Sequence, residues 1–223
     1  MRGFLISFEG GEGTGKTTQA AMLVEALRQR GLSVVAVREP GGTRLGEAVR
    51  EIFLSVDHHD LSPWAEANLV TGARAQLLKE VIIPEMAGGA VIVADRFSDS
   101  TLAYQGAGRG LEMGVLIAMQ LSLKVKPDLT FLLDLEVEEG LRRHAATAGR
   151  SSDRMEREDV AFHERVRQGY LDFARRDPDR YFVIGAAAPR EEIGDRVLDV
   201  TLQRTAAHGV SPGSMRPALE GSE

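Results

Sequence analysis

The sequence predicts an α/β fold in which one five-stranded parallel sheet is covered by helices on both faces. Five short apolar runs, each typical of a buried parallel strand, alternate along the chain with longer segments of helical periodicity. The first run leads directly into a glycine-rich segment, residues 10–17, which opens onto the first helix. Because the crossovers are right-handed and the strands parallel, the carboxyl ends of all strands should lie at one edge of the sheet.

The strands are expected over five ranges: 4–9, 34–37, 90–94, 129–135 and 181–184. The helices are expected over 15–30, 44–55, 63–86, 112–124, 136–146, 156–176 and 189–206. Pro63 suits the first turn of its helix, whereas Pro84 is expected to kink or end the same helix. A glycine cluster (Gly106, Gly108 and Gly110) predicts a loop before the helix at 112–124.

The length of 223 residues favours a single domain, which we expect over residues 1–208. The hydrophobic fraction of 43% and the charged fraction of 27% are ordinary for a globular domain with a sizeable core. The remaining segment, 209–223, is rich in glycine, proline and serine and lacks periodicity, so it is predicted to be disordered.

Charge and composition argue against several classes of partner. The net charge of −6 and the pI of about 5.5 give no overall basic field, so we expect neither nucleic acid nor a membrane surface as a partner. No apolar run approaches the roughly 20 residues that span a bilayer. The glycine-rich motif begins almost at once, which excludes a cleavable signal peptide, and the sequence has no cysteine. We therefore expect a cytoplasmic protein.

The glycine-rich segment fits the pattern Gly, any four residues, Gly-Lys and then Ser or Thr, in a strand–loop–helix context. Its glycines let backbone N–H groups approach an anion, and the following helix points its positive dipole end at the same place. Lys16 can reach the terminal phosphates, and the Thr17 hydroxyl can hold Mg²⁺. A plain glycine-rich turn with a solvated Lys16 is the alternative, but the full match favours a P-loop NTPase fold that binds a nucleoside triphosphate. The residues expected at that ligand are Gly10, Gly11, Glu12, Gly13, Thr14, Gly15, Lys16, Thr17 and Thr18.

Ligands of such sheets bind beyond the carboxyl ends of the strands. This rule places four segments along one rim: 10–17, 38–42, 95–96 and 134–136. Arg50, Arg74 and Arg96 are candidates to gather around a second anion there, because arginine forks pair with phosphate oxygens. A lone arginine is more often part of a surface ion pair. The position of Arg96 directly after a buried strand favours the functional interpretation for that residue.

Residues 142–157 form a polar stretch with five arginines and several small residues. The composition favours a lid that closes over the triphosphate and brings an arginine to the transferring phosphoryl group. A solvated basic face is the alternative, and we prefer it for Arg142 and Arg157. No histidine stands out, so surface or core roles are expected for all five.

Two further segments resemble the signatures of thymidylate kinases. They are Val93–Gln105, with the sequence VADRFSDSTLAYQ, and Arg38–Thr43, with the sequence REPGGT. Together with the glycine-rich motif, the Ala73-Arg74 region and Asp153-Arg154, the resemblance covers about residues 3–205. It implies a nucleoside monophosphate kinase-like fold, a homodimer, and ATP-dependent phosphorylation of thymidine 5′-monophosphate (dTMP) to the diphosphate. Mg²⁺ would be held by Thr17 and Asp95.

The resemblance also implies roles in binding the acceptor nucleotide. Arg96 and Arg50 would bind its 5′-phosphate, and Tyr104 would crowd the 2′ position of the sugar. Arg74 would hydrogen-bond the thymine carbonyl. Glu39 and Asp95 would line the region of the acceptor sugar, phosphate and metal. The base edge would be surrounded by Ser100, Thr101 and Gln105.

The glycine-rich motif carries Glu12 and no arginine, as in bacterial members whose lid supplies the catalytic arginine. Arg150 is the first candidate for that role, followed by Arg143 and Arg154; Lys16 and Arg96 are the other expected catalytic residues.

One departure bears on the choice of acceptor. Family members usually carry a phenylalanine that stacks on thymine four residues before the base-reading arginine, whereas this chain has Val70. Stacking of a base on an aromatic ring is worth about 1–3 kcal/mol in nucleic-acid binders. A kinase for another nucleoside monophosphate is therefore the main alternative activity. A nucleotide-dependent switch protein is less favoured because no Asn-Lys-x-Asp segment follows a later strand, and the intact Lys16 and Arg96 argue against a weakened relative. For the dimer, the apolar helix at 112–124 is the candidate interface.

Overall fold

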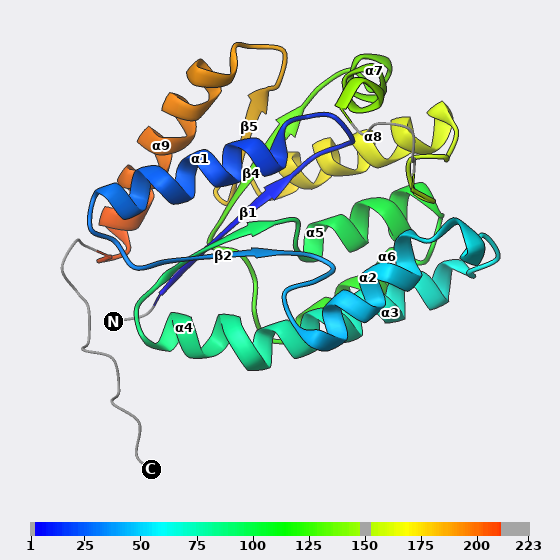
Figure 1. Cartoon of the computed structure of the whole chain (residues 1–223), viewed down its shortest axis with the longest axis horizontal. Helices are drawn as coiled ribbons and strands as arrows, with labels where there is room; N and C mark the ends of the chain where they lie inside the picture. Colours follow the sequence, from blue (N-terminus) through cyan, green and yellow to red (C-terminus); the bar gives the residue numbers. More distant parts are fainter. Residues whose placement is uncertain (1–2, 148–152, 211–223) are drawn as a thin grey trace.

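A computed structural model describes residues 3–147 and 153–210. Its five strands form one parallel sheet in the order β2-β3-β1-β4-β5, which confirms the predicted fold class (Figure 1). The strands are β1 (Phe4–Glu9), β2 (Val34–Arg38), β3 (Val91–Asp95), β4 (Leu129–Asp134) and β5 (Tyr181–Gly185). In the centre of the sheet, Ile6 of β1 pairs with Val93 of β3 on one side and with Leu129 of β4 on the other. Each of the five predicted strands is therefore present.

The longer helices are α1 (Lys16–Gln29), α2 (Arg44–Leu54), α3 (Pro63–Leu77), α6 (Met113–Ser122), α7 (Val137–Thr147), α8 (Val160–Arg176) and α9 (Arg190–Ala207). Shorter helical segments are η1 (Val56–His58), η2 (Leu78–Ile82), α4 (Ile83–Ala87), α5 (Ser98–Thr101) and η3 (Leu102–Gly108). Local sequence explains several starts. Thr43 caps α2 by accepting the N–H of Gly46, and Ser62 caps α3 with Pro63 in its first turn. None of the described helices is both long and apolar enough for a transmembrane span.

The two faces of β1 pack against different helices. Phe4, Ile6 and Phe8 point toward α1 and α9 and share a buried cluster with them. Leu5 points the other way and packs with residues of α3 and η2. Figure 1 shows α1 and α9 on one side of the sheet, with α3, α4, α5 and α6 on the other. The near-continuous apolar sequence of β1 therefore reflects burial on both faces.

Of the glycine cluster, only Gly110, with a φ of 76°, lies in the predicted loop before α6. Gly106 and Gly108 lie in η3, a π-helical continuation of α5. A Cβ on Gly106 would come within 2.6 Å of Met113, and one on Gly108 within 2.6 Å of Phe162. At Gly108 the aromatic ring leaves no room for a side chain, whereas the flexible end of Met113 could move away from Gly106. A local pattern cannot distinguish such close helix packing from a turn.

Other boundaries also differ from the prediction. The helix expected at 63–86 contains a π-helical turn, η2, just before Pro84 and continues to Ala87. This turn accommodates the missing proline N–H, so the proline perturbs the helix without ending it. The helix expected from 156 begins at Val160, where the Asp159 carboxylate caps it. The polar stretch expected from 142 starts later, because residues 142–147 belong to α7. Residues 211–223 of the expected tail lie outside the described residues.

Candidate active site

A cavity of about 890 Å³ lies beyond the carboxyl ends of β1, β2 and β3. All nine residues predicted for the acceptor line it: Glu39, Arg50, Arg74, Asp95, Arg96, Ser100, Thr101, Tyr104 and Gln105. Most of the glycine-rich segment lines it as well, namely Glu12, Gly13, Gly15, Lys16, Thr17 and Thr18. Gly10, Gly11 and Thr14 instead line a much smaller cavity of about 20 Å³. Three of the four rim segments line the large cavity. The fourth, 134–136, follows β4 at the same edge: Asp134 lines the small cavity with the glycine-rich loop, and Asp134 and Glu136 pair with Arg167.

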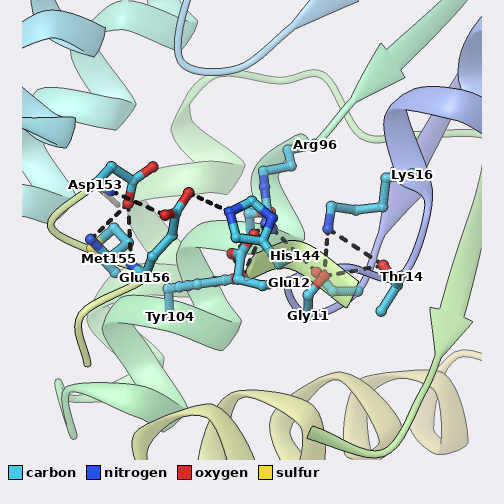
Figure 2. Close-up of polar contacts among 12 residues, drawn as sticks. Gly11, Glu12, Thr14, Lys16, Arg96, Tyr104, His144, Asp153, Met155 and Glu156 are labelled. Atoms are coloured by element: carbon cyan, nitrogen blue, oxygen red, sulfur yellow. Dashed lines mark hydrogen bonds and ion pairs between the residues drawn. The ribbon is translucent and has the colours of Figure 1, made fainter. Parts of the chain in front are cut away.

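The glycine-rich loop is held closely against α7. Gly13 has a positive φ of 66°, and a Cβ there would lie 1.9 Å from the carbonyl oxygen of Gly140. Within the loop, Lys16 Nζ donates to the Gly11 carbonyl at 2.5 Å and to Thr14 Oγ1 at 3.4 Å, as Figure 2 shows. Helix α1 begins at Lys16, so its positive dipole end faces the cavity. Backbone N–H groups, a lysine and a helix terminus therefore converge at a place suited to phosphate.

Lys16 is buried, and its charge is costly there. Burial and then the nearby charge of Arg96 lower the pKa of Lys16 from 10.5 to about 8, although Glu12 and Asp95 oppose the shift. A bound anion would favour the charged form. A polyanionic ligand would therefore raise the pKa of this lysine and hold it in the charged form above pH 8.

Arg96 links the glycine-rich loop to the end of β3. Its Nη1 donates to the Gly10 carbonyl at 3.3 Å, and its Nη2 pairs with Glu12 at 2.8 Å. Its guanidinium also lies 4.9 Å from the ring centroid of Tyr104, whose hydroxyl donates to Glu12 at 2.6 Å (Figure 2). Burial alone would raise the pKa of Glu12, but the charges of Arg96 and Lys16 together with the Tyr104 hydrogen bond lower it to about 2. Glu12 is therefore an anion that orients Arg96 at neutral pH.

Two oxygen-bearing side chains that could bind a metal ion lie together in the cavity. The Thr17 hydroxyl donates to Asp95 Oδ2 at 2.5 Å, and both residues line the cavity. No group of three or more histidine, cysteine, aspartate or glutamate side chains suited to a metal occurs among residues 3–147 and 153–210. A cage made entirely of such side chains is therefore not present there. A hydroxyl and a carboxylate fit Mg²⁺ that completes its coordination with phosphate oxygens and water.

Comparison with known proteins gives the family. The profile described as thymidylate kinase matches residues 8–197, most of the chain. The chain belongs to the thymidylate kinase family. It is 49% identical over 212 residues to the thymidylate kinase of Pelotomaculum thermopropionicum, covering 91% of this chain and 98% of that one. It is 51% identical to the thymidylate kinase of Methylococcus capsulatus, covering 84% of this chain and 89% of that one.

A solved structure agrees with this assignment. The crystal structure of thymidylate kinase from Ehrlichia chaffeensis matches with a TM-score of 0.73 and 29% sequence identity, covering 90% of this chain and all of that one. As a member of the thymidylate kinase family, the chain is an enzyme that phosphorylates dTMP to dTDP in nucleotide biosynthesis and uses ATP. The family decides between the alternatives raised by the sequence in favour of dTMP.

Arg74, predicted to read the base, makes a full set of hydrogen bonds to the protein. Its Nε donates to Glu39 at 2.7 Å, and its Nη1 donates to Thr101 and Gln120. Its Nη2 donates to the carbonyl of Phe97 and pairs with Glu39. The guanidinium nitrogens face protein oxygens, and Arg74 also lines the cavity, so the hydrogen bond to a thymine carbonyl stays a prediction. Through these contacts Arg74 holds Glu39 and Thr101, which line the same cavity.

The three candidates for a lid arginine differ in position. Arg143 lines the cavity from α7, where it donates to Glu139 at 2.7 Å and to the Ala186 carbonyl at 2.8 Å. Arg154 is buried, pairs with Glu66 at 2.5 Å and donates to the Phe53 carbonyl, so its contacts match a structural role better than the predicted catalytic one. Arg150 lies outside the described residues.

Sequence reasoning missed several residues of the cavity. Phe53 and Leu54 line it, and their spacing of three and four from Arg50 on a helix was a usable signal. His144 lines it too and pairs with Glu156 at 2.5 Å, whereas surface or core roles were predicted for every histidine. Figure 2 shows His144 between Glu156 and the Glu12 end of the loop. No local pattern brings together residues from two separate segments in this way.

The lowered pKa of Lys16 makes a prediction about ATP binding. At about pH 9 the free enzyme holds Lys16 mostly neutral, because its pKa is about 8. A bound polyphosphate favours the charged lysine, so binding should take up about one proton at that pH and almost none at about pH 7. Isothermal titration calorimetry in buffers of different ionisation enthalpy measures this uptake. Lys16→Arg is the matched control, since arginine remains protonated; equal uptake by both proteins would contradict the interpretation.

Proposed function

We propose that the cavity binds ATP phosphates on the glycine-rich loop and the 5′-phosphate of dTMP at Arg96 and Arg50. The observation that supports this most directly is the hydrogen bond from Arg96 Nη1 to Gly10 O at 3.3 Å. It joins the expected acceptor-phosphate arginine to the loop that would hold the donor, so the two phosphates would be neighbours. Arg50 lines the same cavity and donates to the Pro40 carbonyl at 3.1 Å.

In this proposal the protein contributes positioning and charge. The acceptor phosphate is already an anion at neutral pH, so the transfer needs no strong general base. Lys16 and the loop N–H groups would stabilise the charge on the transferring phosphoryl group, while Arg96 would hold the attacking oxygen in line. The exposed hydroxyl of Thr17 and the Asp95 carboxylate would hold Mg²⁺, which shields the phosphate charges when bound.

A coupled assay of ADP formation with dTMP, dUMP, dGMP, UMP and AMP tests the acceptor site. We expect the highest kcat/KM with dTMP. Val70 and Phe53 both line the cavity and belong to one apolar cluster, so the discrimination between dTMP and dUMP measures how this wall contacts the thymine methyl group. A rate with AMP or UMP equal to that with dTMP would contradict the proposed acceptor site.

The Mg²⁺ proposal predicts a specific response to Asp95→Asn. Loss of the carboxylate charge should raise the Mg²⁺ concentration needed for half-maximal rate about tenfold, because the hard cation loses an anionic oxygen. Titration of the initial rate with MgCl₂ at fixed ATP measures the shift. Asp57→Asn, at an exposed aspartate of η1, is the control and should leave the curve unchanged. An unchanged curve for Asp95→Asn would remove this residue from the metal site.

We propose further that a lid over residues 142–157 supplies the catalytic arginine and that Arg150 is that residue. The glycine-rich loop carries Glu12 and contains no arginine, so the arginine would come from elsewhere. Arg143 and Arg154 have partners on the protein. Arg150→Ala should lower kcat about 10²-fold at saturating substrates, the effect of removing one donor to developing charge. Arg143→Ala and Arg154→Ala are measured beside it; a larger loss of kcat in either would transfer the role to that residue.

We also propose a homodimer formed through α6. Three side chains of this helix, Val115, Ile117 and Leu121, are 44%, 40% and 66% exposed, an unusual set for a helix surface in a monomer. Analytical ultracentrifugation should give a dimer, and Leu121→Glu should dissociate it. A monomer for the unaltered chain would contradict the proposal.

We propose a cytoplasmic location, which the use of ATP and the cysteine-free sequence support. Cell fractionation tests it, and recovery of the enzyme with membranes or outside the cell would contradict it.

A further inference from the structure

Glu9 is a buried carboxylate to which no catalytic or binding role has been assigned. It is the last residue of β1, directly before the glycine-rich loop, and its exposure is 0%. Its Oε1 accepts the N–H of Phe97 at 2.8 Å. Its Oε2 accepts the hydroxyl of Ser100 at 2.7 Å and that of Tyr170 at 2.9 Å. The carboxylate therefore joins β1, α5 and α8 at one point.

The backbone contact secures a strained residue. Arg96 has a φ of 70°, in the left-handed region that non-glycine residues rarely adopt. Such a conformation persists only where neighbouring structure holds it. The N–H of Arg96 donates to Phe8 O at 3.0 Å, and the next N–H, that of Phe97, donates to Glu9. Both peptide groups around the strained residue are thus bound to the end of β1.

The side-chain contact orients the guanidinium. Arg96 Nη1 donates to Ser100 Oγ at 3.3 Å. A serine hydroxyl has a single hydrogen, and here the Glu9 carboxylate accepts it. The lone pairs of Ser100 are consequently free to receive the N–H of Arg96. Glu9 acts on both the backbone and the side chain of Arg96 without contacting the cavity, which it does not line.

We propose that Glu9 is a positioning residue for the acceptor phosphate: through Phe97 and Ser100 it holds Arg96 in the geometry that binds dTMP. The inference rests on the proposed role of Arg96. It predicts that disturbing Glu9 affects the use of dTMP and leaves the use of ATP nearly intact, although Glu9 adjoins the glycine-rich loop.

The electrostatic setting separates this role from a merely structural one. Burial and then the charge of Asp99 raise the pKa of Glu9 to about 7, against the hydrogen bonds of Ser100 and Tyr170 and the charge of Arg96. The other titratable groups that interact with it are Lys16 and Tyr181. Because the folded pKa lies above the ordinary glutamate value of 4.5, ionisation of Glu9 reduces stability as the pH rises through about 7. At about pH 8 the fold therefore keeps a carboxylate that destabilises it.

Glu9→Gln is the decisive variant, because the amide is isosteric and neutral. Its oxygen can still accept the Phe97 N–H, but its NH₂ group donates to Ser100, where the carboxylate accepted. At about pH 8 we expect the KM for dTMP to rise about tenfold and the KM for ATP to change less than about twofold. The melting temperature should stay equal or rise, since the buried charge is gone.

Two reference variants complete the experiment. Ser7→Ala removes another buried polar side chain from the same face of β1, where it bonds Thr130 at 2.9 Å, and should leave both KM values unchanged. Arg96→Ala should raise the KM for dTMP strongly. If Arg96→Ala does so and Glu9→Gln does not, or raises both KM values equally, the inference about Glu9 fails. If neither variant alters the KM for dTMP, the proposed role of Arg96 fails instead.

Discussion

Replacement of Lys16 by alanine is expected to lower kcat by on the order of 10³-fold or more, the upper range for loss of one group aimed at developing charge. Lys16 lies in the cavity at the N-terminus of α1, where its ammonium would contact the terminal phosphates of ATP. The fold should remain intact, because burial already disfavours the lysine charge and lowers its pKa to about 8. Single-turnover measurements with saturating ATP and dTMP separate the loss of chemistry from the loss of binding.

Lys79→Ala is the matched control, because this lysine is exposed on η2 away from the cavity. It should have normal turnover. The melting temperature of Lys16→Ala should lie close to that of the unaltered enzyme. Near-normal turnover in the folded Lys16→Ala protein would show that the glycine-rich loop does not stabilise the transferring phosphoryl group through this residue.

Arg96→Ala is expected to reduce kcat/KM for dTMP on the order of 10³-fold, which corresponds to a loss of about 4 kcal/mol in transition-state stabilisation. The reason is that a charge-assisted arginine–phosphate pair contributes about 1.5–3 kcal/mol per hydrogen bond. The loss should appear mainly with dTMP, since the lysine and backbone of the loop still bind ATP. The variant also removes the partner of Glu12 at 2.8 Å, so the pKa of Glu12 should rise from about 2. NMR titration of the carboxyl group measures that rise.

Arg142→Ala provides the control for Arg96. Arg142 lines the same cavity, but its side chain is 70% exposed and pairs with Glu139 at 2.8 Å, so its removal should change kcat/KM little. Arg96→Lys tests geometry, because lysine keeps the charge and loses the planar fork. Full activity in Arg96→Ala would exclude this residue from the acceptor site, and full activity in Arg96→Lys would show that charge alone suffices.

Glu9 and Glu12 contribute to the stability of the fold with opposite dependence on pH. Glu12 has a folded pKa of about 2, below the ordinary glutamate value of 4.5. Its ionisation therefore stabilises the fold above pH 4.5, and this contribution is lost as the pH falls through about 2. Glu9 has the opposite sign, with a pKa of about 7. Two carboxylates three residues apart thus respond to pH in opposite directions, because one faces the Arg96 fork and the other is enclosed beside Asp99.

Local patterns were sufficient for the sheet and for most of the site. The apolar runs predicted all five strands within a residue or so, because a strand buried on both faces is apolar throughout. The rule that ligands bind at the carboxyl ends of parallel strands predicted that the glycine-rich loop, Glu39 and Asp95-Arg96 would meet, and they line one cavity. These features depend on the identity and spacing of neighbouring residues.

Features that depend on contacts between distant parts of the sequence could not be predicted from local patterns. Gly106 and Gly108 indicated a loop, whereas both lie in the π-helix η3, and Gly108 packs closely against Phe162. Arg74 has no acidic partner nearby in the sequence, yet Glu39, from another segment, accepts its Nε–H.

The sequence by itself determined the fold class, the glycine-rich loop proposed to bind phosphate and the arginines proposed for the acceptor site. Only the tertiary structure decided which arginines pair with other protein groups; Arg154, for example, is buried against Glu66. It also decided that Glu9 accepts the N–H of Phe97, the residue next to Arg96. The physical reason is that a motif specifies backbone shape and charge over a few residues. The pairing of a buried charge depends on which side chains the fold brings within hydrogen-bonding distance.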